Sequence, residues 1–432
     1  MARRGRGAQA RRSLARRAAP LAVAAGGLAL VAGCGLLPAP PGELGSASQS
    51  CGSGSTITFA IGPDDVGWLQ PIIARWNAAN RHDPVTALYL PQTSNGQLAT
   101  LVANLQAGSC QYDVIDMDVV WTAMFASNHW IIPLNDFSTN GFLAPAVNTA
   151  RYDGQLYAVP DYTNADLLYY RTDLVKKPPA SWGQLAAEAE RLSRADHLGG
   201  YAATLAPYEG LTVNFTEAQQ SAGPPFLTPD GPNVSVNAKQ ALSALDFLVD
   251  GVKDGWIPSQ DLTYEETQAQ DAFLAGQFAF LNMWPDVYTA ADTPGPGNKV
   301  YGKVGVTVLP GPSALGGANL AISAYSRHQA EALDFIRFLT DAQNERVMFT
   351  QGGFPPVLAE LYRDPLLRTR YPDLSWVLDA IEHAQPRPAT ATYEQASQTI
   401  FGQVEAALRQ QETPPQAVQA MSAQLARLIG GG

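Results

Sequence analysis

The chain has 432 residues, of which 46% are hydrophobic and 16% charged, a balance typical of a folded protein and not of a disordered one. Its formal net charge of −11 argues against a nucleic-acid partner, whose phosphates an acidic surface repels. At this length we expect two domains of ordinary size.

The first 33 residues are predicted to be a targeting segment. A region rich in arginine precedes an apolar run over 21–31, which is too short to span a bilayer as a mature helix. The run ends in Val31-Ala32-Gly33-Cys34, which resembles a lipobox. We therefore expect cleavage before Cys34 and lipidation of its thiol. An ordinary cleaved signal with a chance cysteine is the alternative.

Residues 34–50, rich in Pro, Gly and Ser, are predicted to be a tether. Removing 1–33 takes away seven arginines, so the mature chain has 21 basic residues against 39 acids and a formal charge of −18. Membrane attachment would then depend on the lipid alone. Cys51 and Cys110 each stand just before a predicted strand, and an even pair in an exported protein indicates a disulfide. Two buried free thiols are the alternative.

From Thr56 onward, short strands alternate with amphipathic helices. We expect strands at 56–61, 85–90 and 112–117, and helices around 68–76, 97–106 and 121–126. This alternation implies a parallel sheet with helices on both faces. Ligands bind beyond the carboxyl ends of such strands, which places 62–65, 91–95 and 118–121 around one site.

Further along, the pattern predicts one more strand at 304–309 and a series of helices at 182–193, 238–253, 266–275, 329–343 and 397–409. Thr263 and Glu266 have the spacing of a capping box for the helix at 266–275. No second apolar run is long enough to span a membrane.

Several stretches follow one another in the order found in one family. They are Gly-Gln-Leu-Tyr-Ala-Val-Pro at 154–160 with the apolar 167–174, Pro-Ala-Ser-Trp at 179–182, the segment 273–285, and 305–310 with 351–355. Together they resemble the maltose-type extracellular solute-binding proteins of ABC importers. Residues 116–123, Thr163-Asn164, Glu209-Gly210 and 387–390 also resemble the trehalose-binding lipoproteins of actinobacterial recycling importers. The chain is shorter than that group over 281–308.

The resemblance implies an α/β, two-lobed periplasmic-binding fold, with a mainly parallel sheet flanked by helices in each lobe. The first lobe would comprise 51–163 and 317–362, and the second 164–316 and 363–432. It also implies a monomer outside the membrane that binds a small carbohydrate and delivers it to the transmembrane subunits of an ABC permease. We expect no cofactor, no metal and no catalytic activity.

A carbohydrate site needs carboxylates and amides for hydroxyl groups, an arginine as a multiple donor, and an aromatic ring for stacking. The resemblance and the strand ends give eight candidates: Asp65, Gln92, Asp118, Asn164, Glu209, Trp284, Gly317 and Arg387. Each has a structural alternative, such as a helix N-cap for Asp118 or a core position for Trp284. Asp64, Asp116 and Trp121 are substitutes for a wrong choice.

Two other classes of function stay open. A glycosidase would need two carboxylates across a scissile bond, and Asp116 and Asp118 instead lie two apart on one strand. The histidines are scattered, and the common hydrolase and phosphate-loop motifs are missing from the sequence. A binder of a peptide, polyamine or metal complex is the other class, and acids in the cleft would suit a cation.

Overall fold

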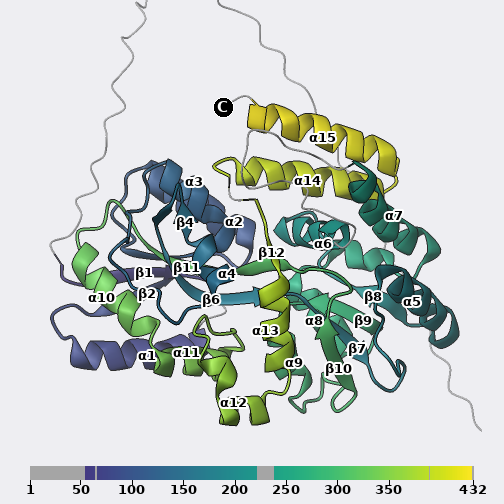
Figure 1. Ribbon diagram of the computed structural model, residues 1–432, viewed down its shortest axis with the longest axis horizontal. Coiled ribbons are helices and arrows are strands. Elements are labelled where there is room, and N and C mark those ends of the chain that lie inside the picture. The colour runs from purple at the N-terminus through teal and green to yellow at the C-terminus, as the bar shows by residue number, and fades with distance from the viewer. Residues whose placement is uncertain (1–53, 64–65, 221–237, 389, 431–432) are drawn as a thin grey trace, which may run out of the picture. The chain divides into compact units, whose positions relative to one another are not determined.

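The computed structural model describes residues 54–63, 66–220, 238–388 and 390–430 (Figure 1). The predicted signal segment and tether, with Cys34, lie outside these residues, as do Cys51, Asp64 and Asp65. No helix within the described ranges is both long and apolar enough to cross a membrane.

The first sheet has the strand order β12-β11-β3-β1-β2. In addition, β6 pairs with β11 on the side opposite β3. Its strands are β1 (Ile57–Ile61), β2 (Val85–Tyr89), β3 (Val114–Asp118), β6 (Val159–Ala165), β11 (Ala314–Ile322) and β12 (Gln385–Pro386). As predicted, β1 runs parallel to β2 and β3. β11 is antiparallel to both β3 and β6, which places Asp118 opposite Ala318 and Asn164 opposite Gly316.

Apolar helix faces bury this sheet and form the first lobe. The helices are α1 (Val66–Ala79), α2 (Ser94–Gln106), α3 (Thr122–Ser127), α4 (Ala144–Thr149), α10 (Gln329–Leu339) and α11 (Ala342–Val347). In the core, the ring of Phe335 on α10 lies edge-on to Phe59 of β1 and to Trp76 of α1, with centroids 5.5 and 5.4 Å apart. α2 begins where Thr93 accepts a hydrogen bond from the Gly96 N–H, and so Ser94 stands at its first turn.

The second sheet has the order β10-β7-β9-β8. Its strands are β7 (Leu167–Arg171), β8 (Gly199–Ala202), β9 (Phe278–Met283) and β10 (Val304–Val308). The expectation of mainly parallel strands is wrong here, because β7 is antiparallel to both β9 and β10. β7 runs in one direction and its two neighbours, β9 and β10, run in the other, so Leu167 pairs with both Met283 and Val308.

Helices complete the second lobe on both faces of this sheet. They are α5 (Trp182–Asp196), α6 (Glu209–Gln220), α7 (Ala238–Asp254), α8 (Glu266–Leu274), α9 (Asp286–Ala291), α12 (Pro365–Arg370), α13 (Leu374–His383), α14 (Tyr393–Leu408) and α15 (Pro414–Gly430). The last two helices, yellow in Figure 1, pack on α6 and α7, and α13 packs on β6 of the first sheet as well as on β10 and β7. The second core therefore combines segments from the middle and the end of the chain.

The chain passes between the two sheets at Asp166, between β6 and β7, and again between β10 and β11. β6 continues two residues beyond the predicted lobe boundary at 163, and β11 begins three residues before the one at 317. The lobe boundaries stay a proposal. Because of these two crossings, the end of β6, the end of β9 and the start of β11 lie close together.

Two local predictions are wrong. The helix predicted at 329–343 divides into α10 and α11, because Thr340 turns its hydroxyl onto Ile336 O and Asp341 accepts the Asn344 N–H as a new N-cap. The capping box of α8 is formed by Glu265 and Gln268 and not by Thr263 and Glu266. Thr263 closes a preceding 3₁₀ turn, Ser259–Thr263, where its hydroxyl donates to Gln260 O.

Candidate carbohydrate site

A pocket of about 400 Å³ opens where the two lobes meet, and we call it the main pocket. Six of the predicted residues line it: Asp118, Asn164, Glu209, Trp284, Gly317 and Arg387. Gln92 lines an adjoining pocket of about 260 Å³, the side pocket, together with Asp116 and Trp121. The two pockets share Ser94, Asp118, Tyr162, Glu266, Thr267 and Gly317, so they are compartments of one cleft.

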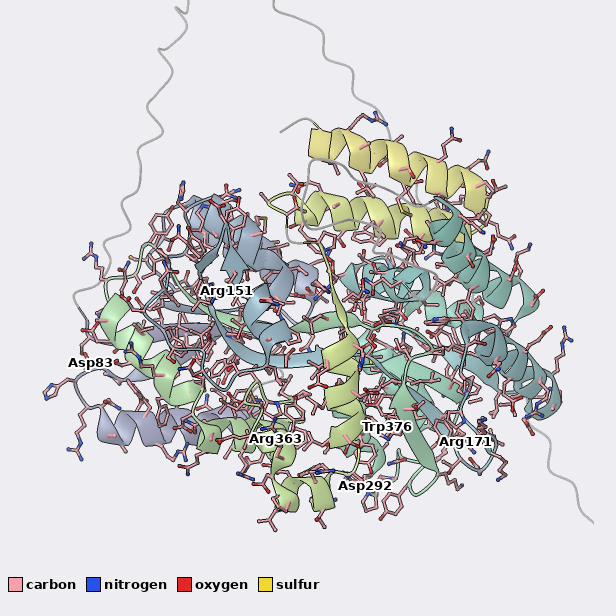
Figure 2. The ribbon with its side chains drawn as sticks, viewed as in Figure 1. Asp83, Arg151, Arg171, Asp292, Arg363 and Trp376 are labelled. Carbon is pink, nitrogen blue, oxygen red and sulfur yellow. The ribbon has the colours of Figure 1, made fainter. Side chains whose placement is uncertain are left out.

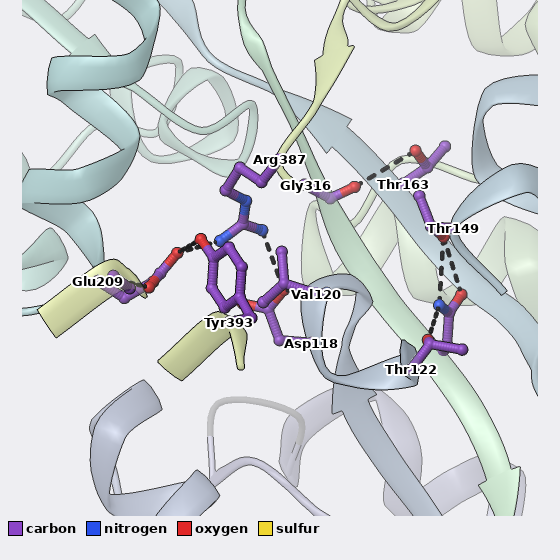
Figure 3. A network of polar contacts seen from close by, with 11 residues as sticks. Asp118, Val120, Thr122, Thr149, Thr163, Glu209, Gly316, Arg387 and Tyr393 are labelled. Atoms are coloured by element: carbon purple, nitrogen blue, oxygen red, sulfur yellow. Dashed lines mark hydrogen bonds and ion pairs between the residues drawn. The ribbon is translucent and has the colours of Figure 1, made fainter. Parts of the chain in front are cut away.

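Arg387 ties the two lobes together across the main pocket (Figure 3). Its Nη2 donates to Asp118 Oδ1 over 2.9 Å, and its Nη1 donates to Glu209 Oε1 over 2.6 Å. Asp118 ends β3 of the first sheet, and Glu209 begins α6 of the second lobe. Arg387 is only 5% exposed, so burial alone lowers its pKa. The carboxylates of Asp118 and Glu209 outweigh burial and hold the pKa of Arg387 above its ordinary value.

Two hydroxyl groups from α14 hold Glu209 in place. Tyr393 donates to the same Oε1 that accepts from Arg387, and Ser397 donates to Oε2 over 2.6 Å. Ser397 in turn lies 2.8 Å from the Thr212 hydroxyl, one turn along α6. Burial raises the pKa of Glu209, and Arg387 acts in the opposite direction. Neither Tyr393 nor Ser397 was predicted from the sequence.

Asp118 is an N-cap, the structural alternative considered for it, and it also lines the main pocket. Its Oδ1 accepts the Val120 N–H over 3.1 Å and so caps the 3₁₀ turn Val119–Trp121. The same oxygen accepts from Arg387. Its side chain is 21% exposed and lines the main pocket. The cap therefore fixes the direction in which Asp118 presents its charge.

Two glycines let side chains that line the main pocket approach the β11 backbone. A Cβ on Gly316 would lie 2.3 Å from Asn164 Oδ1 and 2.8 Å from the Trp284 ring. Gly317 has φ +119°, and a Cβ there would lie 2.3 Å from Tyr162 O. Only glycine adopts this conformation readily. Gly317 therefore acts through backbone shape.

Aromatic rings line more of the main pocket than the sequence indicated. Besides Trp284, which follows β9, they are Tyr162, Tyr208 and Phe354. The rings of Tyr162 and Phe354 have centroids 4.7 Å apart and form one wall. Tyr162 stands two residues before Asn164 on β6, and alternation along a strand places both on one face. That spacing is a signal from which Tyr162 could have been found.

The main pocket is acidic. Glu266 and Asp286 line it in addition to Asp118 and Glu209, and Arg387 is the basic residue in its lining. Within the described part of the chain, no group of three or more His, Cys, Asp or Glu residues is placed to hold a metal ion. The arrangement can accept hydrogen bonds from hydroxyl groups, donate to them, and stack on a flat apolar face.

Near the crossover lies a buried carboxyl pair that sequence reasoning missed. Glu217 accepts the Ala314 N–H at the start of β11 over 3.1 Å and Asn282 Nδ2 over 2.8 Å. Asp166, also hydrogen-bonded to Glu217, has its pKa raised well above the ordinary value by burial and by that neighbour. Burial also raises the pKa of Glu217, to about 7. The two carboxyls thus retain at least one proton near neutrality.

Cys110, just before β3, is disulfide-bonded. Its predicted partner, Cys51, lies outside the described residues, so the pairing stays a prediction. The same holds for Asp65 as a ligand residue and for Cys34 as the lipidated residue.

Known proteins resemble the chain in both sequence and fold. Residues 62–346 match the family model of bacterial extracellular solute-binding proteins. A probable ABC transporter-binding protein of Deinococcus radiodurans is 32% identical over 407 residues, which cover 87% of this chain and 94% of the relative.

Among solved structures, the maltose-bound T. maritima MalE3 has a TM-score of 0.81 and 30% identity, covering 86% of this chain and 99% of that one. The GacH receptor of Streptomyces glaucescens, solved unliganded and with acarbose, has a TM-score of 0.78 and 20% identity, covering 87% and 98%. These likenesses confirm the predicted two-lobed α/β fold. The chain belongs to the family of bacterial extracellular solute-binding proteins of ABC transporters, which bind solutes and are not enzymes.

Proposed function

We propose that this protein captures a small neutral carbohydrate by closure of its two lobes and delivers it to the transmembrane subunits of an ABC permease. One observation carries the proposal. The main pocket combines the ring of Trp284, the Asn164 amide, the carboxylates of Asp118 and Glu209, and the guanidinium of Arg387. Stacking surface beside paired donors and acceptors is the chemistry that a pyranose needs.

The two compartments favour a ligand of two rings, and trehalose or a related α-glucoside is our first choice. The main pocket is rich in aromatic rings, and the side pocket offers mainly amides, acids and hydroxyls, among them Gln97 and Gln268. One ring would stack in the main pocket while the second makes hydrogen bonds in the side pocket. The sequence motifs shared with trehalose-binding lipoproteins and the maltose in the similar structure support an α-glucoside.

The proposed assignment of ligand residues follows these compartments. Asp118, Asn164, Glu209, Trp284, Gly317 and Arg387 serve the main pocket, and Gln92 serves the side pocket. Asp65 remains a proposed contact on sequence grounds, since it follows the β1 strand end. Tyr162 and Phe354 join the set as a second stacking wall.

The test is a thermal-shift screen followed by calorimetric titration of the purified protein with trehalose, maltose, glucose, mannitol and spermidine. A ligand at about a hundred times its dissociation constant adds about 2.7 kcal/mol of stability. We expect trehalose or maltose to raise the unfolding midpoint without being hydrolysed. No response to any sugar or polyol would refute the proposed function.

A matched pair of variants tests the two compartments. Gln97 lines only the side pocket and Gln270 only the main pocket, and both are half-buried residues on helices. Gln97→Ala is expected to weaken the binding of a disaccharide and to leave the binding of glucose unchanged. Gln270→Ala is expected to weaken both sugars. Equal responses of both sugars to Gln97→Ala would exclude a second ring in the side pocket.

The acidic lining motivates a second candidate, a cationic solute such as a polyamine. Glu266 and Asp286 add negative charge to a pocket in which Arg387 already lies between two carboxylates. Binding of this kind would weaken strongly with salt, because ionic attraction is screened, whereas sugar binding would change little. In the screen above, a shift with spermidine alone would favour this candidate.

Outside the cleft, we propose that the protein is a monomer held at the outer side of the cell membrane by a lipid on Cys34. The lipobox-like Val31-Ala32-Gly33-Cys34 supports this anchor. Cys34→Ala should move the protein from the membrane fraction to the soluble fraction. Retention of the variant in the membrane would contradict lipidation at this residue.

A further inference from the structure

Arg387 lines not only the carbohydrate cleft but also a separate pocket of about 330 Å³, which we call the arginine pocket. Its walls come from the turn after β3, from α3 and α4, and from the strands β11 and β12. Most of the lining is apolar, including Val120, Ala123, Leu315 and Pro386. Figure 3 labels Val120, Thr122, Thr149 and Arg387, four residues of this lining.

The charge of the arginine pocket is opposite to that of the cleft. Arg387 and Arg151 line it, and none of its lining residues is an acid. This is unexpected in a chain with 39 acidic and 28 basic residues. Arg151 begins β4 (Arg151–Tyr152) in the first lobe (Figure 2), and its side chain is exposed, with a 3.5 Å contact to Gly154 O. It can therefore turn toward an anion.

One nitrogen of the buried arginine has no hydrogen-bond partner within the described residues. Arg387 gives its Nη1 and Nη2 to Glu209 and Asp118, but its Nε is buried and has no hydrogen-bond partner within the described residues. A buried N–H without an acceptor is unfavourable, and a ligand oxygen would remove that cost. Two carboxylates already balance the charge of Arg387. Arg387 would therefore supply a bound anion with a hydrogen-bond donor, and Arg151 would supply the positive charge.

We propose that the arginine pocket binds a small monocarboxylate with an apolar body, and that this site is coupled to the carbohydrate site through Arg387. One carboxylate oxygen accepts from Arg387 Nε and the other faces Arg151, while the apolar body lies against Val120, Ala123 and Leu315. A bare phosphate fits this pocket less well, because its apolar walls cannot replace the water around a doubly charged ion.

The coupling follows from shared contacts. An acceptor at Nε holds the guanidinium in the orientation in which Nη1 and Nη2 reach Glu209 and Asp118. Those same three side chains line the carbohydrate pocket. The carboxylate therefore tightens sugar binding, and by thermodynamic reciprocity the sugar tightens carboxylate binding by the same factor. This coupling rests on the proposed function, whereas carboxylate binding by itself does not.

The experiment titrates the purified protein with hexanoate and benzoate, and with their neutral counterparts hexanamide and benzamide. We expect the carboxylates to bind and the amides to bind at least about tenfold more weakly, the scale of a charged hydrogen bond. Arg151→Gln should weaken carboxylate binding by about tenfold. It should not change the affinity for sugar measured in the absence of carboxylate. Arg81→Gln, an exposed arginine of the same lobe outside the pocket, is the matched control.

In the second part, trehalose is titrated with and without saturating carboxylate, and we expect about a fivefold gain in affinity. The proposal is overturned if the amides bind as well as the acids, if Arg151→Gln behaves like Arg81→Gln, or if no carboxylate binds. An unchanged sugar affinity at saturating carboxylate refutes the coupling. If carboxylates bind as expected but no sugar does, the proposed function fails and the carboxylate site stands.

Discussion

Arg387 and Glu209 lie 2.6 Å apart across the cleft, although 178 residues separate them in the chain. Glu209→Gln keeps the shape of the side chain but removes its charge, so Arg387 keeps only Asp118 as an ionic partner. We expect sugar binding to weaken by about 1.5–3 kcal/mol, the scale of a hydrogen bond to a charged group. Calorimetry measures this change, with Glu382→Gln on the surface of α13 as the control. An unchanged affinity would mean that Glu209 is dispensable.

Trp284 is expected to supply most of the stacking surface. Trp284→Ala should weaken sugar binding by about 1–3 kcal/mol, the scale of one lost aromatic contact. The control is Trp376→Ala, because Trp376 is 41% exposed on α13 and lies outside the cleft lining (Figure 2). If both folded variants bind like the wild type, Trp284 does not contact the ligand.

Two glycine substitutions should change stability in opposite directions. Gly317→Ala forces a Cβ to within 2.3 Å of Tyr162 O at φ +119°, so we expect a loss of about 2 kcal/mol or more in the free energy of unfolding. Gly402 on α14 has nothing within 4 Å of a built Cβ, and Gly402→Ala should gain about 0.5–1 kcal/mol. Urea denaturation gives both values, and equal effects would contradict the argument.

The Asp166 and Glu217 pair predicts how stability depends on pH. The pKa of Glu217 is about 7 in the folded protein against an ordinary 4.5, and the pKa of Asp166 is also raised. Between pH 4.5 and 7 the unfolded chain releases protons that the folded one keeps, so stability falls as pH rises through this window.

In Asp166→Asn the amide can donate to Glu217 without first binding a proton. This variant should therefore reduce the fall in unfolding free energy between pH 4.5 and 7 by about 2 kcal/mol. Unfolding free energies measured between pH 4 and 8 test this, with Asp196→Asn, an exposed carboxylate, as the control for loss of a charge. A profile for Asp166→Asn parallel to the wild type would count against the shared proton.

The predicted Cys51–Cys110 disulfide can be tested by alkylation. Both thiols should resist labelling in the native, unreduced protein and react after reduction, as the bonded state of Cys110 suggests. Reduction should lower the free energy of unfolding by about 3–4 kcal/mol, because the bond closes a long loop. Labelling of both cysteines without reduction would exclude the pairing.

The sequence predicted the parts of this molecule that depend on local pattern. The strands β1 and β2 and the helices α2, α5 and α7 lie within a few residues of their predicted positions, because alternation and helical periodicity mark buried faces directly. The pattern did not reveal the antiparallel pairing of β7, which depends on where the chain returns from distant segments. It also placed the α8 cap two residues early, because Thr263 makes a competing bond.

For the site, strand ends and family motifs identified residues such as Asp118, Trp284 and Arg387. They could not identify Tyr393 and Ser397, which hold Glu209 from 184 and 188 residues away. Nothing in local sequence marks a residue whose role is to support another across the fold. The need for glycine at position 316 became clear only from the close approach of Asn164 and Trp284.

The position of β11 also has a kinetic consequence. This strand lies between β3 and β6, yet the whole second sheet, β7 to β10, and the helices α5 to α9 separate it in sequence from them. The first sheet therefore cannot be completed from contiguous sequence as the chain emerges from the ribosome. Pairing between distant segments slows folding, since the loop between them must close first. The first lobe therefore cannot complete its sheet until the segment between β6 and β11 has been synthesised.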